Sequence, residues 1–132
     1  MMLSTDPIAD MLSRIRNAAL IKSRTVNIPY SKSKVAILKV LSDAGWIGSV
    51  EVQGTSSRTV VVTLKYDEQE QSMIRYIRKI STPGRRVYVG RTELPIVANN
   101  FGMAVISTSQ GMMTNREARR RKLGGEVICE VQ

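Results

Sequence analysis

Apolar residues near the start of the chain recur at the spacing of a helix. Asp6 can cap the free backbone amides of such a helix, and Pro7 suits its first position. One helix face carries apolar residues at intervals of three or four: Ile8, Met11, Leu12, Ile15 and Ala19. The pattern predicts a helix that begins at about residue 7 and buries one side.

A short strand and a second helix are predicted next. Apolar residues alternate over 26–30, and Pro29 restricts this strand to its own end or to a sheet edge. Ser31 or Ser33 can cap the second helix, and Gly45 can take the left-handed conformation that follows it. This helix has its own apolar stripe: Val35, Leu38 and Leu41.

Two β-prone runs complete the first half of the chain. Residues 46–53 and 58–66 are joined by 54–57, whose Gly, Thr and Ser residues are typical of a turn. The two runs predict a hairpin. The acidic, polar stretch 67–72 follows and is interpreted as a linker.

The pattern after residue 72 is mainly that of short strands. Residues 73–80 fit either a strand or a turn of helix. Pro83 and Gly84 predict a turn, which a short strand at 86–89 follows. Residues 103–106 predict another strand, which ends in polar residues.

A short helix and a closing strand are predicted at the C-terminus. Thr114 and Glu117 match a capping box, in which each side chain accepts from a free backbone amide. The helix should run to about Lys122, because two glycines at 124–125 stop it. The closing strand presents one alternating apolar face: Val127, Cys129 and Val131.

These elements predict an α+β protein of two small domains. The N-terminal domain covers 1–66 with the order α-β-α-β-β, and an acidic linker covers 67–72. The C-terminal domain, 73–132, is mostly β with one short helix. A chain of 132 residues that is 42% hydrophobic can bury a core, which excludes a disordered chain.

The net charge is +9, from 20 Lys and Arg against 11 Asp and Glu. Most of the cations are Arg, whose planar guanidinium suits phosphates and stacked bases. So large an excess on a short chain favours a polyanionic partner, with nucleic acid ahead of an anionic membrane surface. A solvated surface that keeps the protein in solution is the alternative.

Residue types that many enzyme mechanisms need are missing. The chain contains no His and one Cys, which excludes zinc sites and His-based triads. Cys129 is expected to be a small buried residue, because no His is present to activate its thiol. No phosphate-loop or dinucleotide motif is present. An enzyme, a cofactor and a small-molecule substrate are therefore unsupported alternatives.

Two further features indicate a cytoplasmic protein. No apolar run approaches the roughly 20 residues that cross a bilayer, and Asp6 and Asp10 lie where a signal peptide is positively charged. A single cysteine fits a reducing compartment. We therefore expect no membrane partner.

The densest group of cations lies on the predicted C-terminal helix. Five fall within seven residues: Arg116, Arg119, Arg120, Arg121 and Lys122. The first three share a helix face, and the group repels itself unless an anion is near. A phosphate partner is one interpretation, and a solvated helix partly neutralised by Glu117 is the other.

Arg85 and Arg86 lie close to Tyr88, on or beside a short strand. Cations beside an aromatic ring are typical of surfaces that bind phosphates and stack on bases. Tyr88 is equally compatible with a place in the core.

The loop 107–111 carries three consecutive hydroxyl residues, Ser107, Thr108 and Ser109, at the end of an apolar strand. Hydroxyls can donate to and accept from base edges, ribose hydroxyls and phosphates, which is how RNA minor grooves and irregular loops are read. An ordinary surface turn is the alternative.

The first half adds a smaller group of cations. Arg14, Arg16 and Asn17 lie on or beside the polar face of the first predicted helix. Lys32 and Lys34 begin the second helix, where a phosphate finds both cations and free amides. Ordinary solvated residues are the alternative.

Three segments resemble one known family. Residues 6–18, DPIADMLSRIRNA, and 83–88, PGRRVY, are similar to the eighth protein of the bacterial small ribosomal subunit. The most specific segment is 102–114, GMAVISTSQGMMT, which continues in register to GGEVIC at 124–129. The resemblance covers nearly the whole chain in order.

The resemblance implies a structural RNA-binding protein rather than an enzyme. Such a protein binds the central domain of small-subunit (16S) ribosomal RNA early in assembly, among neighbouring small-subunit proteins, and its Ser-Thr-Ser loop enters the minor groove of an irregular RNA helix. By motif, the C-terminal RNA-binding residues are Ser107, Thr108, Ser109, Gly111, Thr114, Tyr88, Gly124, Gly125 and Glu126. In the N-terminal domain, Arg14, Asn17 and Lys32 would hold the RNA backbone.

One position departs from the family pattern. Family members often carry Lys after Ser-Thr-Ser, whereas this chain has Gln110, so a neutral hydrogen bond would have to replace a phosphate contact. A basic RNA-binding regulator or chaperone without a fixed site is the alternative function.

Overall fold

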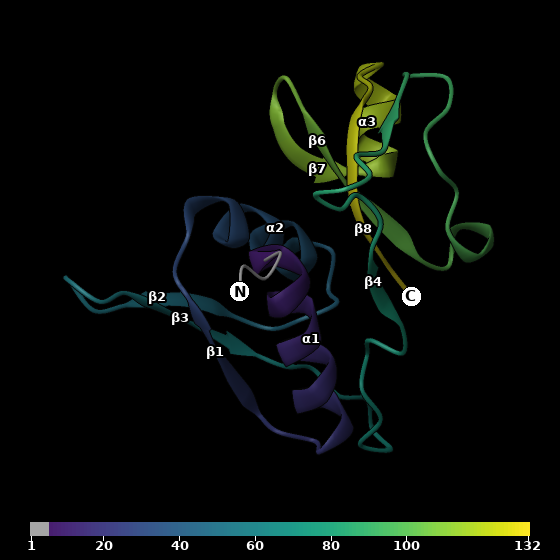
Figure 1. Ribbon diagram of the computed structural model, residues 1–132. Coiled ribbons are helices and arrows are strands. Elements are labelled where there is room, and N and C mark those ends of the chain that lie inside the picture. The colour runs from purple at the N-terminus through teal and green to yellow at the C-terminus, as the bar shows by residue number, and fades with distance from the viewer. Residues whose placement is uncertain (1–5) are drawn as a thin grey trace.

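Two antiparallel sheets, joined by two helices, form the fold of the computed structural model, which describes residues 6–132 (Figure 1). The elements of the N-terminal part are α1 (Pro7–Leu20), β1 (Thr25–Pro29), α2 (Lys32–Asp43), β2 (Val50–Gln53) and β3 (Thr59–Thr63). The C-terminal elements are β4 (Ile77–Lys79), β5 (Tyr88–Val89), a 3-10 turn at Ala98–Asn100, β6 (Met103–Thr108), β7 (Gly111–Thr114), α3 (Asn115–Arg121) and β8 (Gly125–Val131). The predicted α+β class is confirmed.

The first helix begins where its cap predicts. The Asp6 carboxylate accepts hydrogen bonds from the amides of Ile8 at 3.2 Å and Ala9 at 3.1 Å, and Pro7 is the first helical residue. The predicted stripe is turned inward, with Met11, Leu12 and Ile15 fully buried. Sequence periodicity was sufficient here because the helix buries only one face.

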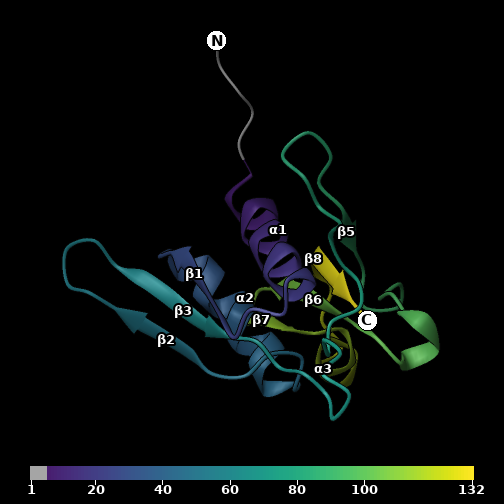
Figure 2. The ribbon, with the colours of Figure 1, turned by 90° about the horizontal axis from the view of Figure 1, so that it is seen from below.

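The N-terminal sheet has the strand order β1-β3-β2. Pro29 ends β1, which lies at a sheet edge, as a residue without an amide hydrogen requires. Ser31 caps α2 by accepting from the Lys34 amide, and Gly45 follows the helix with φ +88°. The predicted hairpin is β2–β3, which extends to the side opposite β5 (Figure 2).

The C-terminal sheet has the order β4-β8-β6-β7, with β5 also paired to β8. Residues 73–80, which fit two interpretations, contribute the strand β4. The prediction of a loop from residue 107 is wrong at its start, because Ser107 and Thr108 belong to β6 and pair with Met112 and Gly111. The strand β7 was not predicted. Its four residues show no alternation of apolar and polar side chains, and they form a strand by pairing with β6.

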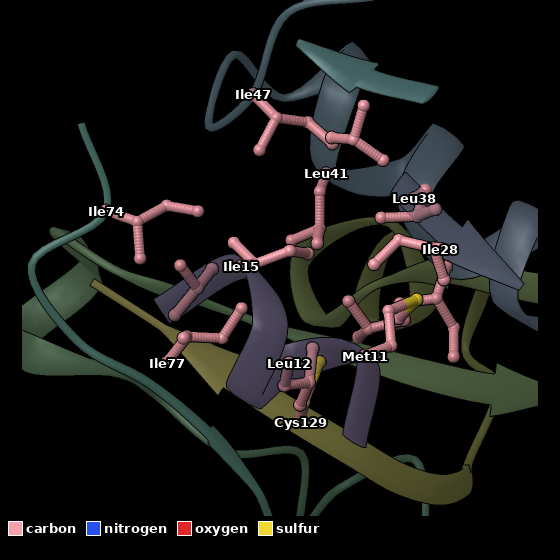
Figure 3. Packing of buried hydrophobic residues seen from close by; sticks show 14 of the residues in the cluster. Met11, Leu12, Ile15, Ile28, Leu38, Leu41, Ile47, Ile74, Ile77 and Cys129 are labelled. Atoms are coloured by element: carbon pink, nitrogen blue, oxygen red, sulfur yellow. The ribbon is translucent and has the colours of Figure 1, made fainter. Parts of the chain in front are cut away.

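One hydrophobic core contains residues from both halves of the chain. It includes residues of α1 and α2 and also residues of β4, β6 and β8. Figure 3 shows Leu12, Ile77 and Cys129 within this cluster, contributed by α1, β4 and β8. The helix α1 packs on β1 and β4, and α2 packs on β2 and β7, so both helices connect the two sheets.

A second cluster lies against α3, and it includes Ala104, Ile106, Ala118 and Val127. Residues of β6 alternate between the two clusters, so this strand is buried on both faces. The prediction that Val127 shares a face with Cys129 is wrong. The register shifts between Val105, which pairs with Cys129, and Ile106, which pairs with Val127, so a β-bulge interrupts the alternation of β8.

Cys129 is fully buried, as predicted. Burial raises the pKa of its thiol to about 12, because the charged thiolate is poorly solvated there. The thiol is therefore protonated at neutral pH and has the packing role of a small apolar side chain.

Candidate nucleic-acid interface

Three predicted site residues lie in one row across the C-terminal sheet. Tyr88 of β5 pairs with Glu126 of β8, and Glu126 pairs on its other side with Ser107 of β6. Residues directly opposite each other in antiparallel strands point to the same face, so these three side chains share a face. The row continues to Met112 of β7. An aromatic ring, a carboxylate and a hydroxyl are thus brought together from segments far apart in the chain.

The turn between β6 and β7 is held by Thr108. Its hydroxyl donates to the Gly111 carbonyl at 2.9 Å and accepts from the Gln110 amide at 3.1 Å. Gly111 has φ +109°, a conformation that favours glycine. Thr108 therefore fixes the turn, while the hydroxyls of Ser107 and Ser109 make no side-chain hydrogen bond among residues 6–132 and can serve a ligand.

Two glycines allow the strands of this row to approach closely. A Cβ atom at Gly125 would lie 2.1 Å from the Ser107 carbonyl oxygen, and one at Gly124 would lie 2.4 Å from the Val89 carbonyl oxygen. Both contacts are with backbone, so no side-chain rotation relieves them. Gly124 and Gly125 therefore contribute to the site by setting the strand spacing.

The carboxylate of Glu126 is fixed by its neighbours. It accepts from the hydroxyl of Ser81, which is fully buried and itself accepts from the Val87 amide at 3.1 Å. Arg86 forms an ion pair with Glu126 at 3.4 Å. These contacts orient the carboxylate and bring one arginine beside the row.

The predicted turn at Pro83 and Gly84 is confirmed by paired backbone hydrogen bonds between Thr82 and Arg85, at 3.0 and 3.1 Å. Arg85 is exposed on this turn. Tyr88 is 69% exposed, so its ring belongs to the surface and the core interpretation is wrong.

Ion pairs organise the cations of α3. The Glu117 carboxylate accepts from both Arg120 and Arg121, the latter at 2.7 Å. These hydrogen bonds, from Arg120 first and Arg121 second, lower the pKa of Glu117 to about 2. Glu117 is therefore charged at neutral pH, which supports the interpretation of a partly neutralised helix.

The capping box at the start of α3 is only half as predicted. Thr114 accepts from the Glu117 amide at 3.0 Å, but the Glu117 carboxylate accepts from the two arginines instead of from a backbone amide.

The other two arginines of α3 make different contacts. Arg119 donates to the carbonyls of Leu94 and Pro95 at 3.4 and 3.5 Å. Arg116 lies exposed in the first turn of the helix.

Arg121 also contacts the β6–β7 turn, which the sequence did not predict. Its guanidinium donates to the side-chain oxygen of Gln110 at 3.2 Å while it also contacts Glu117. Gln110 thus places a cation beside the turn although it carries none itself. The contact could not be predicted, because it joins two elements whose packing is set by the sheet.

The N-terminal candidates lie on other elements. Arg14 is exposed on α1 and pairs with Asp10 at 2.9 Å, and Asn17 and Lys32 are also exposed. Both interpretations of Lys34, as a phosphate contact and as a solvated residue, are wrong: only 6% of it is exposed, and its amine donates to the Pro29 carbonyl at 3.3 Å.

Arg16 joins the two halves of the chain by donating to the Ile77 carbonyl.

Within residues 6–132, no group of three or more metal-ligating side chains is present. None of the helices in this part of the chain is long and apolar enough to span a bilayer.

The fold and this surface define a small, basic, two-sheet α+β protein with a polar row and turn flanked by arginines. A family model described as ribosomal protein S8 matches residues 6–132. Among the relatives is small ribosomal subunit protein uS8 of Bordetella avium, 50% identical over 96% of this chain and 97% of the relative. The uS8 proteins of Sorangium cellulosum and Trichodesmium erythraeum are each 47% identical, over 96% and 98% of this chain and 98% and 99% of theirs.

The chain therefore belongs to the ribosomal protein S8 family. Membership makes it a structural protein of the small ribosomal subunit and not an enzyme. The resemblance found in the three sequence segments is confirmed over the full described length.

Proposed function

We propose that this protein binds directly to the central domain of 16S ribosomal RNA and helps that domain assemble. The observation that carries the proposal is the row of Tyr88, Glu126 and Ser107, which ends beside the turn that Thr108 holds. An aromatic face, a fixed acceptor and unpartnered hydroxyls are groups that recognise unstacked bases and 2′-hydroxyls.

The work is divided between neutral and charged residues. Ser107 and Ser109 read the RNA at short range, and Tyr88 provides a stacking surface for one base. Arg85, Arg86 and the cations of α3 attract phosphates and hold the protein in position. A second contact with the RNA backbone comes from exposed residues of the N-terminal helices, Arg14, Asn17 and Lys32. Thr114 contributes by capping the start of α3.

Arg120 has a competing partner, because the Glu117 carboxylate already binds its guanidinium. A phosphate must displace that carboxylate from the guanidinium or share the guanidinium with it. As a phosphate contact, Arg120 should contribute less to RNA binding as the salt concentration rises. The protein works in the cytoplasm, in contact with neighbouring proteins of the small subunit.

Replacing Ser107 with alanine tests this assignment. We expect about fivefold weaker binding to a central-domain transcript, because one hydrogen bond is lost. Binding to bulk transfer RNA should be nearly unchanged. Affinities are measured by filter binding at one fixed salt concentration. Thr108→Ala is less informative, because the Thr108 hydroxyl also holds the turn.

Ser57→Ala is the matched control, since Ser57 is an exposed serine on the remote β2–β3 loop. It should leave both affinities unchanged. Equal losses on both RNAs with Ser107→Ala would contradict the proposal and favour a basic RNA chaperone without a fixed site.

A further inference from the structure

A surface cavity where the two halves of the chain meet combines two aromatic residues with an arginine. It has a volume of about 290 Å³, and the residues that line it include Trp46, Phe101, Met103, Thr114 and Arg116. Trp46 follows α2, whereas the other four come from the segment that begins just after the 3-10 turn and ends in the first turn of α3. The two aromatic residues therefore line one cavity only in the folded chain.

Phe101 is held at the surface by its backbone. Its side chain is 84% exposed, and its amide donates to the Ala98 carbonyl at 3.0 Å. Ala98 and Asn99 have φ +48° and +52°, which is unfavourable for residues with a Cβ atom. At Gly102 a Cβ would lie 2.5 Å from the Val131 carbonyl oxygen, so the next residue is fixed as well. The chain keeps an unfavourable turn and an exposed ring together.

Trp46 gives the cavity a side that is supported by the core. Its amide donates to the Leu41 carbonyl at 3.0 Å, and its half-buried ring packs against the large core. The ring therefore lines the cavity while it packs against the core. A rigid aromatic surface loses little conformational entropy when a planar ligand stacks on it.

One strand connects the cavity with the candidate interface. The strand β7 runs from the turn at Gly111 to Thr114, and Thr114 both lines the cavity and caps α3. Arg116 is the one ionisable residue among the described lining residues. Its positive charge favours an anionic ligand over an apolar side chain of a protein partner.

We propose that this cavity accepts one unstacked base of the bound RNA, with Trp46 and Phe101 as stacking surfaces and Arg116 beside the phosphate. The volume of about 290 Å³ is just below the roughly 300–1,000 Å³ of pockets for drug-sized ligands, which suits a single planar base. Aromatic side chains that stack splayed-out bases are a general means of RNA recognition. This inference rests on the proposed function and adds a second contact to it.

The fluorescence of Trp46 reports on the cavity directly, because the chain contains one tryptophan. The intact protein is titrated with a central-domain transcript, and stacking should quench the emission. Phe101→Ala should reduce the quenching and weaken binding about fivefold or more, the loss of one base stack. Ile96→Ala is the control, because Ile96 is 62% exposed on the same connecting segment but does not line the cavity.

Two results would overturn the inference. One is tight binding of the transcript by both wild type and Phe101→Ala with no change in Trp46 emission, which would leave the proposed function standing. The other is quenching by purified small-subunit proteins but not by the transcript, which would assign the cavity to a protein partner. A transcript that does not bind at all would instead refute the proposed function.

Discussion

Replacing Gly125 with alanine is expected to lower the free energy of unfolding by about 3 kcal/mol, at the upper end of the usual effect of overpacking. The added Cβ would lie 2.1 Å from the Ser107 carbonyl oxygen and 3.2 Å from the Thr108 Cα. Both atoms belong to the β6 backbone, so relief requires β6 and β8 to move apart. The change would also misplace Ser107 relative to Glu126.

Urea denaturation followed by circular dichroism measures this effect. Gly84→Ala is the matched control, because no atom lies within 4 Å of a Cβ at Gly84 and the residue lies in an exposed turn. Its free energy of unfolding should change by no more than about 0.5 kcal/mol. Equal stability of the two variants would contradict the strand spacing described for the C-terminal sheet.

Replacing Tyr88 with alanine is expected to weaken binding to the central-domain transcript roughly ten- to hundredfold, the cost of losing one base–aromatic stack. Tyr88 is 69% exposed, so the change should leave stability almost unaltered. Tyr88→Phe should keep most of the affinity, because the ring remains. Isothermal titration calorimetry at fixed salt measures the affinities of wild type, Tyr88→Ala and Tyr88→Phe for the transcript.

Tyr76→Ala is the control for this series. Tyr76 is also exposed, at 42%, but it lies just before β4 and has no place in the row. It should bind the transcript like wild type. Equal affinities of Tyr88→Ala and Tyr76→Ala would show that Tyr88 does not stack on the RNA.

Elements stabilised by local signals could be predicted from the sequence. The cap at Asp6 and the turn at Pro83 act within a few residues and are present as predicted, and Ser31 is the cap among the two serines predicted for the second helix. The N-terminal hairpin is present because its two strands are adjacent in sequence. In each case, the sequence near the element contained the information that determines it.

Features that depend on distant pairing could not be predicted. Ser107 and Thr108 continue β6 because β7 pairs with them, and the bulge in β8 appears only in its register with β6. Lys34 was expected to be accessible, either to a phosphate or to solvent, but it is buried and its amine donates to the Pro29 carbonyl. These outcomes depend on packing between elements, which a local pattern does not encode.

The candidate site also combines features that the local sequence indicates with features that depend on distant pairing. The Ser-Thr-Ser segment was found from its residue types and its family resemblance, whereas its alignment with Tyr88 and Glu126 required the strand register. Arg121 was predicted only as one of five helix cations, and its contact with Gln110 is tertiary. The sequence thus indicates which groups are present, and the fold determines which of them act together.

Chemical footprinting of the purified protein on intact small-subunit ribosomal RNA tests the central claim most directly. The account predicts one compact protected region, in an irregular helix of the central domain, at protein concentrations that leave the rest of the RNA reactive. Tyr88→Ala should lose this protection at the same concentration, and Tyr76→Ala should keep it. Weak protection spread over all domains, unchanged by Tyr88→Ala, would contradict site-specific recognition by the row.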